Sequence, residues 1–428
     1  MKKLAVLLST LLLGSTSLWA SEGTTSQLSA GDTAWMLTST CLVLMMTLPG
    51  LALFYGGLVR SKNILSIFVQ CFAMAGLMSI LWVVFGYAVA NGGEGDWVAW
   101  NPEYFMLNHI TPDLLSGTIP ESVFVTFQMT FIIITPALIV GAFAERMKFS
   151  AMLIFTTVWT ILSYLPVWHM AWGGGFFHST LHAIDFAGGN VVHINAGIAG
   201  LLACIMLGKR RGYPGPGLVP HNVPLVLIGA GLLWVGWFGF NAGSALAANG
   251  SAGMAMLTTQ ISCAAGVVVW MLLEWKIAKK PTAVGVATGA VAGLVAITPA
   301  AGSTTIGGAL ALGAISSLIC YFTATKLKHK LGYDDTLDVF GVHGVGGIVG
   351  AILTGVFLRE GASELSVGEQ VWAQFLSVVI TIAWSAVAAT IGLYLAKFLA
   401  GGLRVDSETE DMGLDLSVHG EEAYNSES

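Results

Sequence analysis

The chain has 428 residues, of which 55% are hydrophobic and 10% are charged. Its mean hydropathy is +0.77 and its formal net charge is −6. This composition excludes an ordinary soluble domain and gives no reason to expect a nucleic-acid partner, so we predict an all-α polytopic membrane protein embedded in the lipid bilayer.

The first twenty residues differ from the rest of the chain. Lys2 and Lys3 precede an apolar run over residues 4–13, and a polar stretch follows Ala20. This order is typical of a cleaved secretory signal peptide. Reading it as a further membrane span is less favoured, because ten apolar residues are too few to cross about 30 Å of hydrocarbon. We expect residues 1–20 to be removed and the mature chain to begin outside the membrane.

Eleven later segments are long and apolar enough to be transmembrane helices. They cover residues 33–59, 64–90, 121–144, 149–171, 186–208, 223–247, 252–275, 282–299, 306–325, 337–358 and 371–402. Fifteen of the 16 Lys and Arg residues beyond position 20 lie in alternate connections or beside the C-terminal tail, and Arg359 alone lies on the other side. The positive-inside rule then predicts an outside N-terminus and an inside C-terminus.

An internal repeat links two of these segments. Residues 192–200 (VHINAGIAG) and 342–350 (VHGVGGIVG) align without a gap and place His193 and His343 at matching positions. Five helices per repeat is an odd number, so the repeat is inverted in the membrane, with repeat A over about 33–208, repeat B over about 223–358 and a final long helix over about 371–402. Ionisable side chains inside membrane spans mark transport pathways by default, although one histidine alone could simply join packed helices.

An aspartate precedes each histidine helix. Asp185 lies at the predicted outer end of the fifth helix and Asp338 at the predicted inner end of the tenth. Both residues are placed to cap a helix N-terminus. At about 1.5 Å per residue, the two helices would carry His193 and His343 from opposite faces toward the middle of the membrane.

Neither a cofactor nor a catalytic site is indicated. All five cysteines fall within apolar segments and none forms a C-x-x-C pair, so we expect no disulfide framework and no metal centre. An intramembrane metal or hydrolytic site at Asp185, His193 and His343 is the enzymatic alternative. It lacks an H-E-x-x-H motif or a second nearby carboxylate.

Five motifs, in order, give the chain a specific resemblance to a known family. They are residues 51–57 (LALFYGG), 141–146 (GAFAER), 185–197 (DFAGGNVVHINAG), 236–244 (GWFGFNAGS) and 338–344 (DVFGVHG). Together they resemble the ammonium transporter (Amt/Mep/Rh) family, bacterial Amt branch, from about residue 33 to the tail. The resemblance implies the ammonium-transporter fold over residues 21–402, a homotrimer with one pore per subunit, and residence in the cytoplasmic membrane of a bacterium.

The family's functional residues can be carried over position by position. The resemblance implies an outer recognition site at Phe131, Trp172 and Ser244, a gate at Phe131 and Phe240, further lining of the pore by Phe127 and Trp237, twin pore histidines at His193 and His343, and an acidic position at Asp185 near the outer mouth. The loop over residues 176–184 is about one residue longer than in the family pattern. Trp172 is therefore aligned to its family position across a loop of different length, whereas the histidines are not. Without the motifs, the aromatic residues would be interpreted as core.

Physical chemistry supports these roles independently. An aromatic face attracts a cation by roughly 0.5–2 kcal/mol, and a serine hydroxyl can accept one N–H bond. Carrying a bare monovalent ion into a dry pore costs roughly 10–20 kcal/mol in the idealised limit. Deprotonating an amine-like cation costs only about 3–4 kcal/mol at neutral pH. Ammonium and methylammonium can therefore enter as neutral amines past uncharged imidazoles, a route that K⁺ lacks.

Some alternatives stay open at this point. The proton could cross separately, which makes transport electrogenic, or stay outside, which makes the protein a passive NH₃ channel. A sensor with little net flux is a further alternative. The acidic tail over residues 403–428 contains GLD at 413–415 and HGEEAY at 419–424, which resemble the family's cytoplasmic tail and imply a PII-type signal protein as partner.

Overall fold

The computed structural model describes residues 27–215 and 217–424, so the predicted signal peptide at 1–20 lies outside the described residues. Within this part of the chain, ten helices are long and apolar enough to cross a membrane, and the shorter apolar helix α13 (Ala283–Ile297) matches the predicted segment 282–299. The prediction of eleven apolar helices is therefore confirmed. The largest difference is at the fourth crossing, which runs over Phe149–Ser179 and was expected to end at about residue 171.

Several crossings are interrupted by a π-helical turn, written here as η. In chain order the elements of the crossings are α2 (Ala30–Met45), η1 (Met46–Leu51) and α3 (Ala52–Leu58); η2 (Ser61–Asn63), α4 (Ile64–Leu81), η3 (Trp82–Gly86) and α5 (Tyr87–Ala90); α6 (Glu121–Phe143); α7 (Phe149–Trp159), η5 (Thr160–Tyr164), α8 (Leu165–Trp172) and α9 (Phe176–Ser179); η6 (Gly189–Ile194) and α10 (Asn195–Leu207); α11 (Val223–Gly243); α12 (Gly250–Ile277); α13; α14 (Ile306–Phe322), η7 (Thr323–Leu327) and α15 (Lys328–Leu331); η8 (Val339–Gly344) and α16 (Val345–Phe357); and α17 (Val367–Leu399). The one exception in this series is η2, a single 3-10 turn.

The bundle has two ends that differ in their connections. Residues 403–424 form α18 (Ser407–Met412) and η9 (Asp415–His419) at one end, which we call the tail face. The opposite end, the N-terminal face, carries the start of α2, a short 3-10 segment η4 (Pro102–Leu107) and an antiparallel pair of two-residue strands, β1 (Leu115–Ser116) and β2 (Ile119–Pro120).

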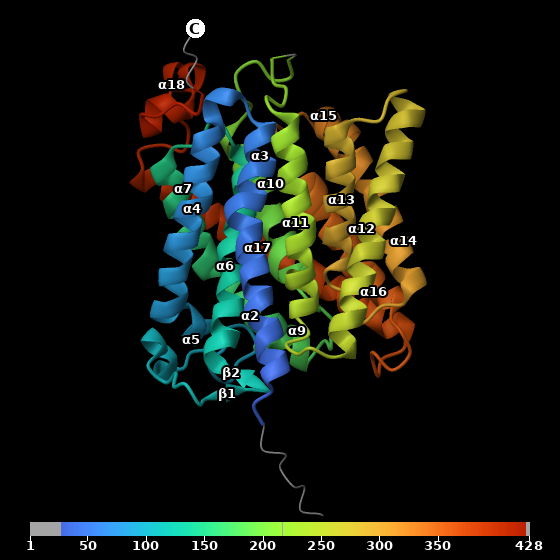
Figure 1. Ribbon diagram of the computed structural model, residues 1–428. Coiled ribbons are helices and arrows are strands. Elements are labelled where there is room, and N and C mark those ends of the chain that lie inside the picture. Colours follow the sequence, from blue (N-terminus) through green and yellow to red (C-terminus); the bar gives the residue numbers. More distant parts are fainter. Residues whose placement is uncertain (1–26, 216, 425–428) are drawn as a thin grey trace, which may run out of the picture.

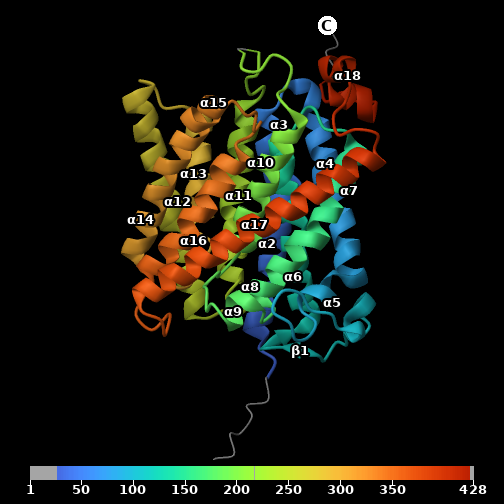
Figure 2. The same ribbon diagram turned by 180° about the vertical axis from the view of Figure 1, so that it is seen from behind.

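The two histidine-bearing helices run in opposite directions. The chain from η6 through α10 ends at the tail face, whereas the chain from η8 through α16 begins there and runs away from it. This antiparallel pair has the arrangement that an inverted repeat requires. In Figure 2, α17 crosses the front of the bundle diagonally, and it packs against α7, α10 and α16. The final long helix thus packs against elements of both halves.

Candidate functional site

The two repeat-related histidines meet in the interior of the bundle. His193 comes from η6 and His343 from η8, and they are 1% and 4% exposed. Their Nδ1 atoms lie 3.3 Å apart, and their rings are stacked with centroids 5.4 Å apart. The duplicated pattern therefore produces one side-chain pair, built from residues 150 positions apart.

Glycines allow the helices carrying this pair to approach each other. A Cβ atom on Gly197 would lie 2.3 Å from the Gly344 Cα atom, which no side chain can accommodate. At the matching position of the second repeat, a Cβ atom on Gly347 would lie 2.9 Å from Ile194 Cγ1 and 3.1 Å from His193 Cβ. Close packing of membrane helices depends on such small residues, so the spacing of the two imidazoles is set by backbone contact.

Each histidine turn begins with a capping carboxylate. Asp185 accepts hydrogen bonds from the backbone N–H groups of residues 188, 189, 190 and 191 at 2.5–3.2 Å, which confirms it as a cap. Burial raises the pKa of Asp185, and these hydrogen bonds offset only part of that rise.

The predicted cap of the second histidine turn was wrong by three residues. The carboxylate of Asp335 accepts from the N–H groups of Val339 and Phe340 at 3.1 and 2.8 Å. Asp338 has a left-handed backbone (φ 58°) and pairs with Lys328 at 2.5 Å. Burial and the nearby Asp338 charge raise the pKa of Asp335 to about 6. A left-handed residue cannot fold its side chain back over the first turn as a normal N-cap does, so the earlier aspartate takes that position.

An unbroken series of aromatic rings leads to the histidines from the side of the N-terminal face. Trp172 and Phe131 are in edge contact at 5.8 Å, and Phe131 and Phe240 lie 4.3 Å apart. Phe240 lies 6.0 Å from the His193 ring. The structure thus brings these predicted residues together in the order Trp172, Phe131, Phe240, His193, His343.

Two further predicted residues flank this series. Phe127 packs against Phe131 at 5.1 Å, and Trp237 stacks on His193 at 5.4 Å. Trp237 is held by a hydrogen bond from its indole N–H to Thr298 Oγ1 at 3.0 Å. Phe127, Phe131, Phe240 and Trp237 are all at most 2% exposed.

Local hydrogen bonds position the Trp172 and Ser244 side chains. The Trp172 indole N–H donates to the Asp185 carbonyl at 2.7 Å, so the longer loop between them still returns to the tryptophan. Ser244, at the C-terminal end of α11, donates its hydroxyl proton to the Phe240 carbonyl at 2.8 Å. The donated proton leaves the Ser244 oxygen free to accept a hydrogen bond.

The interior around the histidines has almost no room for water. The volume in which the centre of a water molecule could lie is about 10 Å³, between side chains that include Leu138, Trp237 and Phe240. This is about the space of one water molecule. On the tail side of His343 the protein opens into a cavity of about 190 Å³, whose walls include Arg210, Thr336 and Asp338.

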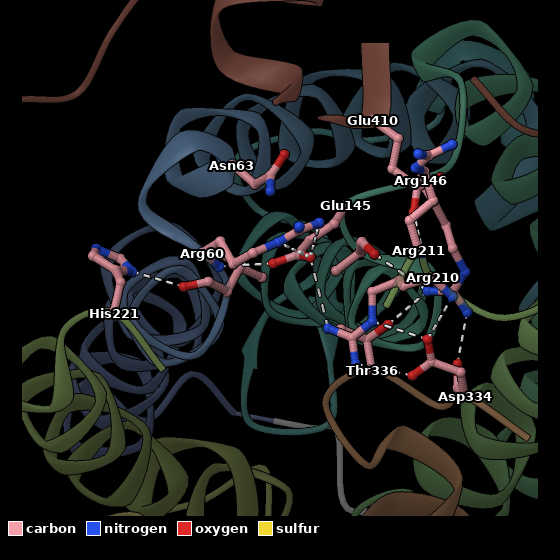
Figure 3. A network of polar contacts seen from close by, with 12 residues as sticks. Arg60, Asn63, Glu145, Arg146, Arg210, Arg211, His221, Asp334, Thr336 and Glu410 are labelled. Atoms are coloured by element: carbon pink, nitrogen blue, oxygen red, sulfur yellow. Dashed lines mark hydrogen bonds and ion pairs between the residues drawn. The ribbon is translucent and has the colours of Figure 1, made fainter. Parts of the chain in front are cut away.

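Arg210, in the wall of that cavity, belongs to a network of buried ion pairs (Figure 3). Glu145 has a left-handed backbone (φ 73°) and accepts from the backbone N–H and the Nε of Arg60 at 2.7 and 2.8 Å. Its carboxylate lies 3.7 Å from Arg210 Nη1, and Arg210 donates through Nε and Nη2 to the two Asp334 oxygens at 2.9 Å each. Burial alone would raise the pKa of Asp334, but the hydrogen bonds and charge of Arg210 outweigh it and lower that pKa.

Arg146 ties the same region together from the centre. It is fully buried and donates to the carbonyls of Ala142, Ala144, Gly208 and Asp334 and to the Thr336 hydroxyl, at 2.6–3.3 Å. These acceptors come from the last turn of α6, from the connections that follow α6 and α10, and from the connection that precedes η8. One side chain therefore joins the ends of the three elements that carry Phe131, His193 and His343.

The tail docks beside this network. Glu410 accepts from the Arg211 backbone N–H at 2.7 Å and pairs with Arg404 at 2.6 Å. The carboxylate of Asp415 accepts from the N–H groups of Leu65 and Ser66 at 3.0 and 2.7 Å, so a tail residue caps the N-terminus of α4.

Comparison with known proteins identifies the family. The model of the Ammonium Transporter Family matches residues 34–424. The chain belongs to the ammonium transporter family. Among its relatives are the ammonium transporter of Aquifex aeolicus, 49% identical with 95% of this chain and 96% of that protein covered, and the one of Bacillus subtilis, 45% identical with 92% and 98% covered. The predicted resemblance is confirmed: the chain is a multi-pass membrane protein of ammonium transport, in a family that is not enzymatic.

Solved structures agree with the fold. Mep2 of Candida albicans superposes with a TM-score of 0.80 at 31% identity, covering 89% of this chain and 88% of that one. A protein described as a sensor Amt protein superposes with a TM-score of 0.84 at 29% identity, covering 91% and 98%.

The tail-face ion pairs were not predicted from the sequence. Glu145 and Arg146 were recognised only as part of a family motif, and Arg210 and Arg211 only as charges that fix orientation. A signal was nevertheless present, because the charged pair Glu145 and Arg146 directly follows a long apolar run, and Asp334 and Asp335 form an acidic pair just before the second histidine turn.

Proposed function

We propose that ammonium is recognised as a cation at Phe131, Trp172 and Ser244, loses a proton there, and crosses past the twin histidines as ammonia. The observation that carries this proposal is the buried histidine pair, which an aromatic series separates from the N-terminal face and which has space for about one water molecule beside it. With Nδ1 atoms 3.3 Å apart, two uncharged imidazoles can share a hydrogen bond in which one ring donates and the other accepts. In this scheme Phe131 and Phe240 act as the gate, Phe127 and Trp237 line the path, and Asp185 shapes the outer mouth.

The aromatic site suits a weakly held, partly hydrated cation. Trp172 and Phe131 offer ring faces, and the free lone pairs of Ser244 offer one acceptor. A neutral amine can exchange hydrogen bonds with the imidazoles, whereas K⁺ would have to enter without its hydration shell.

Substitution of His193 tests the proposal. In His193→Asp, an ionised carboxylate would supply a fixed charge and draw water into the pore, so K⁺ should begin to pass or to compete; a protonated one should lower flux without a K⁺ leak. His193→Ala removes the hydrogen-bond partner without adding charge, so ammonium flux should fall while K⁺ stays excluded. Potassium and methylammonium uptake in vesicles containing each protein decide between these outcomes. Full, ammonium-selective transport in both variants would mean that His193 is a packing residue.

We further propose that the proton crosses by a separate route, so that transport is electrogenic. An ammonium jump applied to proteoliposomes should then produce a charge-transfer current. Flux without current would instead indicate a passive NH₃ channel. The structural likeness to a sensor Amt protein favours a sensor role as the second candidate, and binding without flux in the same vesicles would support it.

The remaining proposals concern assembly and orientation. We infer a homotrimer in a bacterial cytoplasmic membrane, with the signal peptide at 1–20 removed, the N-terminal face outside and the tail at 403–428 inside. Single cysteines at Gly95 and Gly361, in a cysteine-free background, should react with an impermeant thiol reagent from outside, whereas one at Gly212 should not. The opposite result at any site would reverse the orientation there.

The tail is proposed as the contact for a PII-type signal protein. Deleting residues 405–428 should leave insertion and the trimer intact, since the tail contacts the bundle at its end, but should lower flux or abolish partner binding. The deletion also removes the Asp415 cap of α4, so Asp415→Ala serves as the control for loss of the cap alone. Unchanged flux and unchanged partner binding in the deletion variant would refute this role.

A further inference from the structure

A groove outside the pore opens near the tail face between α10 and α15. It has a volume of about 570 Å³, and its apolar lining consists of Leu201, Cys204, Ile205, Leu327, Leu331 and Phe340. Ile205 is 54% exposed and Leu331 is 65% exposed, although both belong to helices that cross the membrane. Exposed aliphatic side chains on membrane-spanning helices, together with the other apolar walls of the groove, suit contact with an acyl chain.

A lysine lines this groove, and two more lie on a segment that forms its wall. Lys209 lines it just beyond the end of α10, and Lys326 and Lys330 are exposed on η7 and α15, the elements that supply Leu327 and Leu331 to the lining. In the described ranges, none of these three lysines has a carboxylate within 4.0 Å, whereas Lys328 on the same turn is paired with Asp338. These lysines thus carry cationic charge that the protein itself does not neutralise.

The acidic residue of the lining does not cancel that charge. Asp334 borders the groove, but its side chain is 0% exposed and both its oxygens are bound by Arg210. Basic clusters between transmembrane helices at a membrane surface are typical headgroup sites for anionic lipids. Apolar walls and these lysines match the two halves of such a lipid.

We propose that this groove binds one anionic phospholipid of the leaflet on the tail side, with its phosphate at Lys209 and an acyl chain against Ile205, Leu331 and Phe340. Phe340 connects this groove to the turn that carries His343. Phe340 belongs to η8, the turn that carries His343, and its ring lies 2.8 Å from where a Cβ atom on Gly344 would stand. The lipid therefore contacts the outside of the turn whose inner side forms the histidine pair.

Quenching of an introduced tryptophan by brominated lipids tests the site in the full-length protein. Leu331→Trp is suitable because Leu331 is largely exposed, and Leu327→Trp is a second reporter; the signal of the native tryptophans is subtracted with the parent protein. Vesicles of dioleoylphosphatidylcholine carry increasing fractions of either brominated phosphatidylglycerol or brominated phosphatidylcholine. The anionic lipid should quench the reporter at a mole fraction at least threefold lower than the neutral lipid.

Charge substitutions locate the binding. The combined variant Lys209→Gln with Lys330→Gln should abolish the threefold preference. The matched variant Lys279→Gln with Lys280→Gln, which removes two charges from the connection between α12 and α13, should keep it. Equal quenching by both lipids, or a preference unaffected by the Lys209 and Lys330 changes, would overturn the proposal. Quenching by neither lipid would do so too, and would indicate that a protein surface covers the groove.

Discussion

The two ends of the proposed pore are built from different chemistry. Toward the N-terminal face the path consists of ring contacts, and its carboxylate, Asp185, is wholly engaged in capping a helix. At the tail face, Arg146 and Arg210 bind Glu145 and Asp334 in a buried network. Ring contacts are individually weak, whereas a buried ion pair is costly to break. The contrast suggests that the first end selects the substrate and the second end fixes the geometry.

The largest effect is expected where one charge of a buried pair is removed. Asp334→Asn leaves Arg210 partly unpaired, which should lower the free energy of unfolding by about 3–5 kcal/mol. Asp411→Asn is the matched control, because its pair with Arg211 is about half exposed and should contribute less than about 1 kcal/mol. Thermal unfolding of the two variants in detergent measures the difference. Similar melting temperatures for both would mean that the network does not hold the tail face together.

The same pair should make stability depend on pH. Because the pKa of Asp334 is lowered in the folded protein, its contribution is present above its unfolded pKa of about 4 and is lost as the pH falls through the lowered value. The stability gap between the parent protein and Asp334→Asn should therefore be constant from pH 7 to 5 and narrow below about pH 4. A stability gap that is the same at pH 3 as at pH 7 would contradict the stabilising role of the ionised Asp334 carboxylate.

Loss of the Asp185 cap should have a slightly smaller effect. Asp185→Ala leaves four backbone N–H groups without their acceptor, which should cost about 2–4 kcal/mol and reduce the amount of folded transporter. Asp185→Asn retains an acceptor oxygen and should recover part of the loss. Melting temperature and flux per folded protein separate a structural effect from a direct effect on substrate, since only the latter lowers flux at equal folding.

The smallest effects are expected at the aromatic end. Trp172→Leu and Ser244→Ala each remove one modest contact, so each should weaken apparent ammonium affinity by about 1–2 kcal/mol. Trp275→Leu, at a tryptophan 59% exposed on α12, should leave affinity unchanged. Concentration dependence of methylammonium uptake measures all three. Complete loss of flux in Ser244→Ala at normal membrane levels would place the hydroxyl in the gate or the proton path.

The helices and the histidine pair were predictable because they depend on features that recur along the chain. Apolar segment length, alternating charge and a duplicated motif define the eleven crossings and bring His193 and His343 together. The cap at Asp338 and the tail-face ion pairs were not predictable in this way. Each depends on a left-handed residue, Asp338 or Glu145, that turns the chain locally and decides which carboxylate meets which helix or arginine. Hydrophobic periodicity does not report such turns.

The contact between Gly197 and Gly344 also bears on how the protein is made. His193 enters the membrane well before its partner, because almost 150 residues and four further crossings are synthesised before η8 appears. Until then Gly197 and the Nδ1 atom of His193 have no partner from the second repeat. The histidine pair therefore cannot form in a half-made chain, because a nascent protein that stalls before residue 339 still lacks His343.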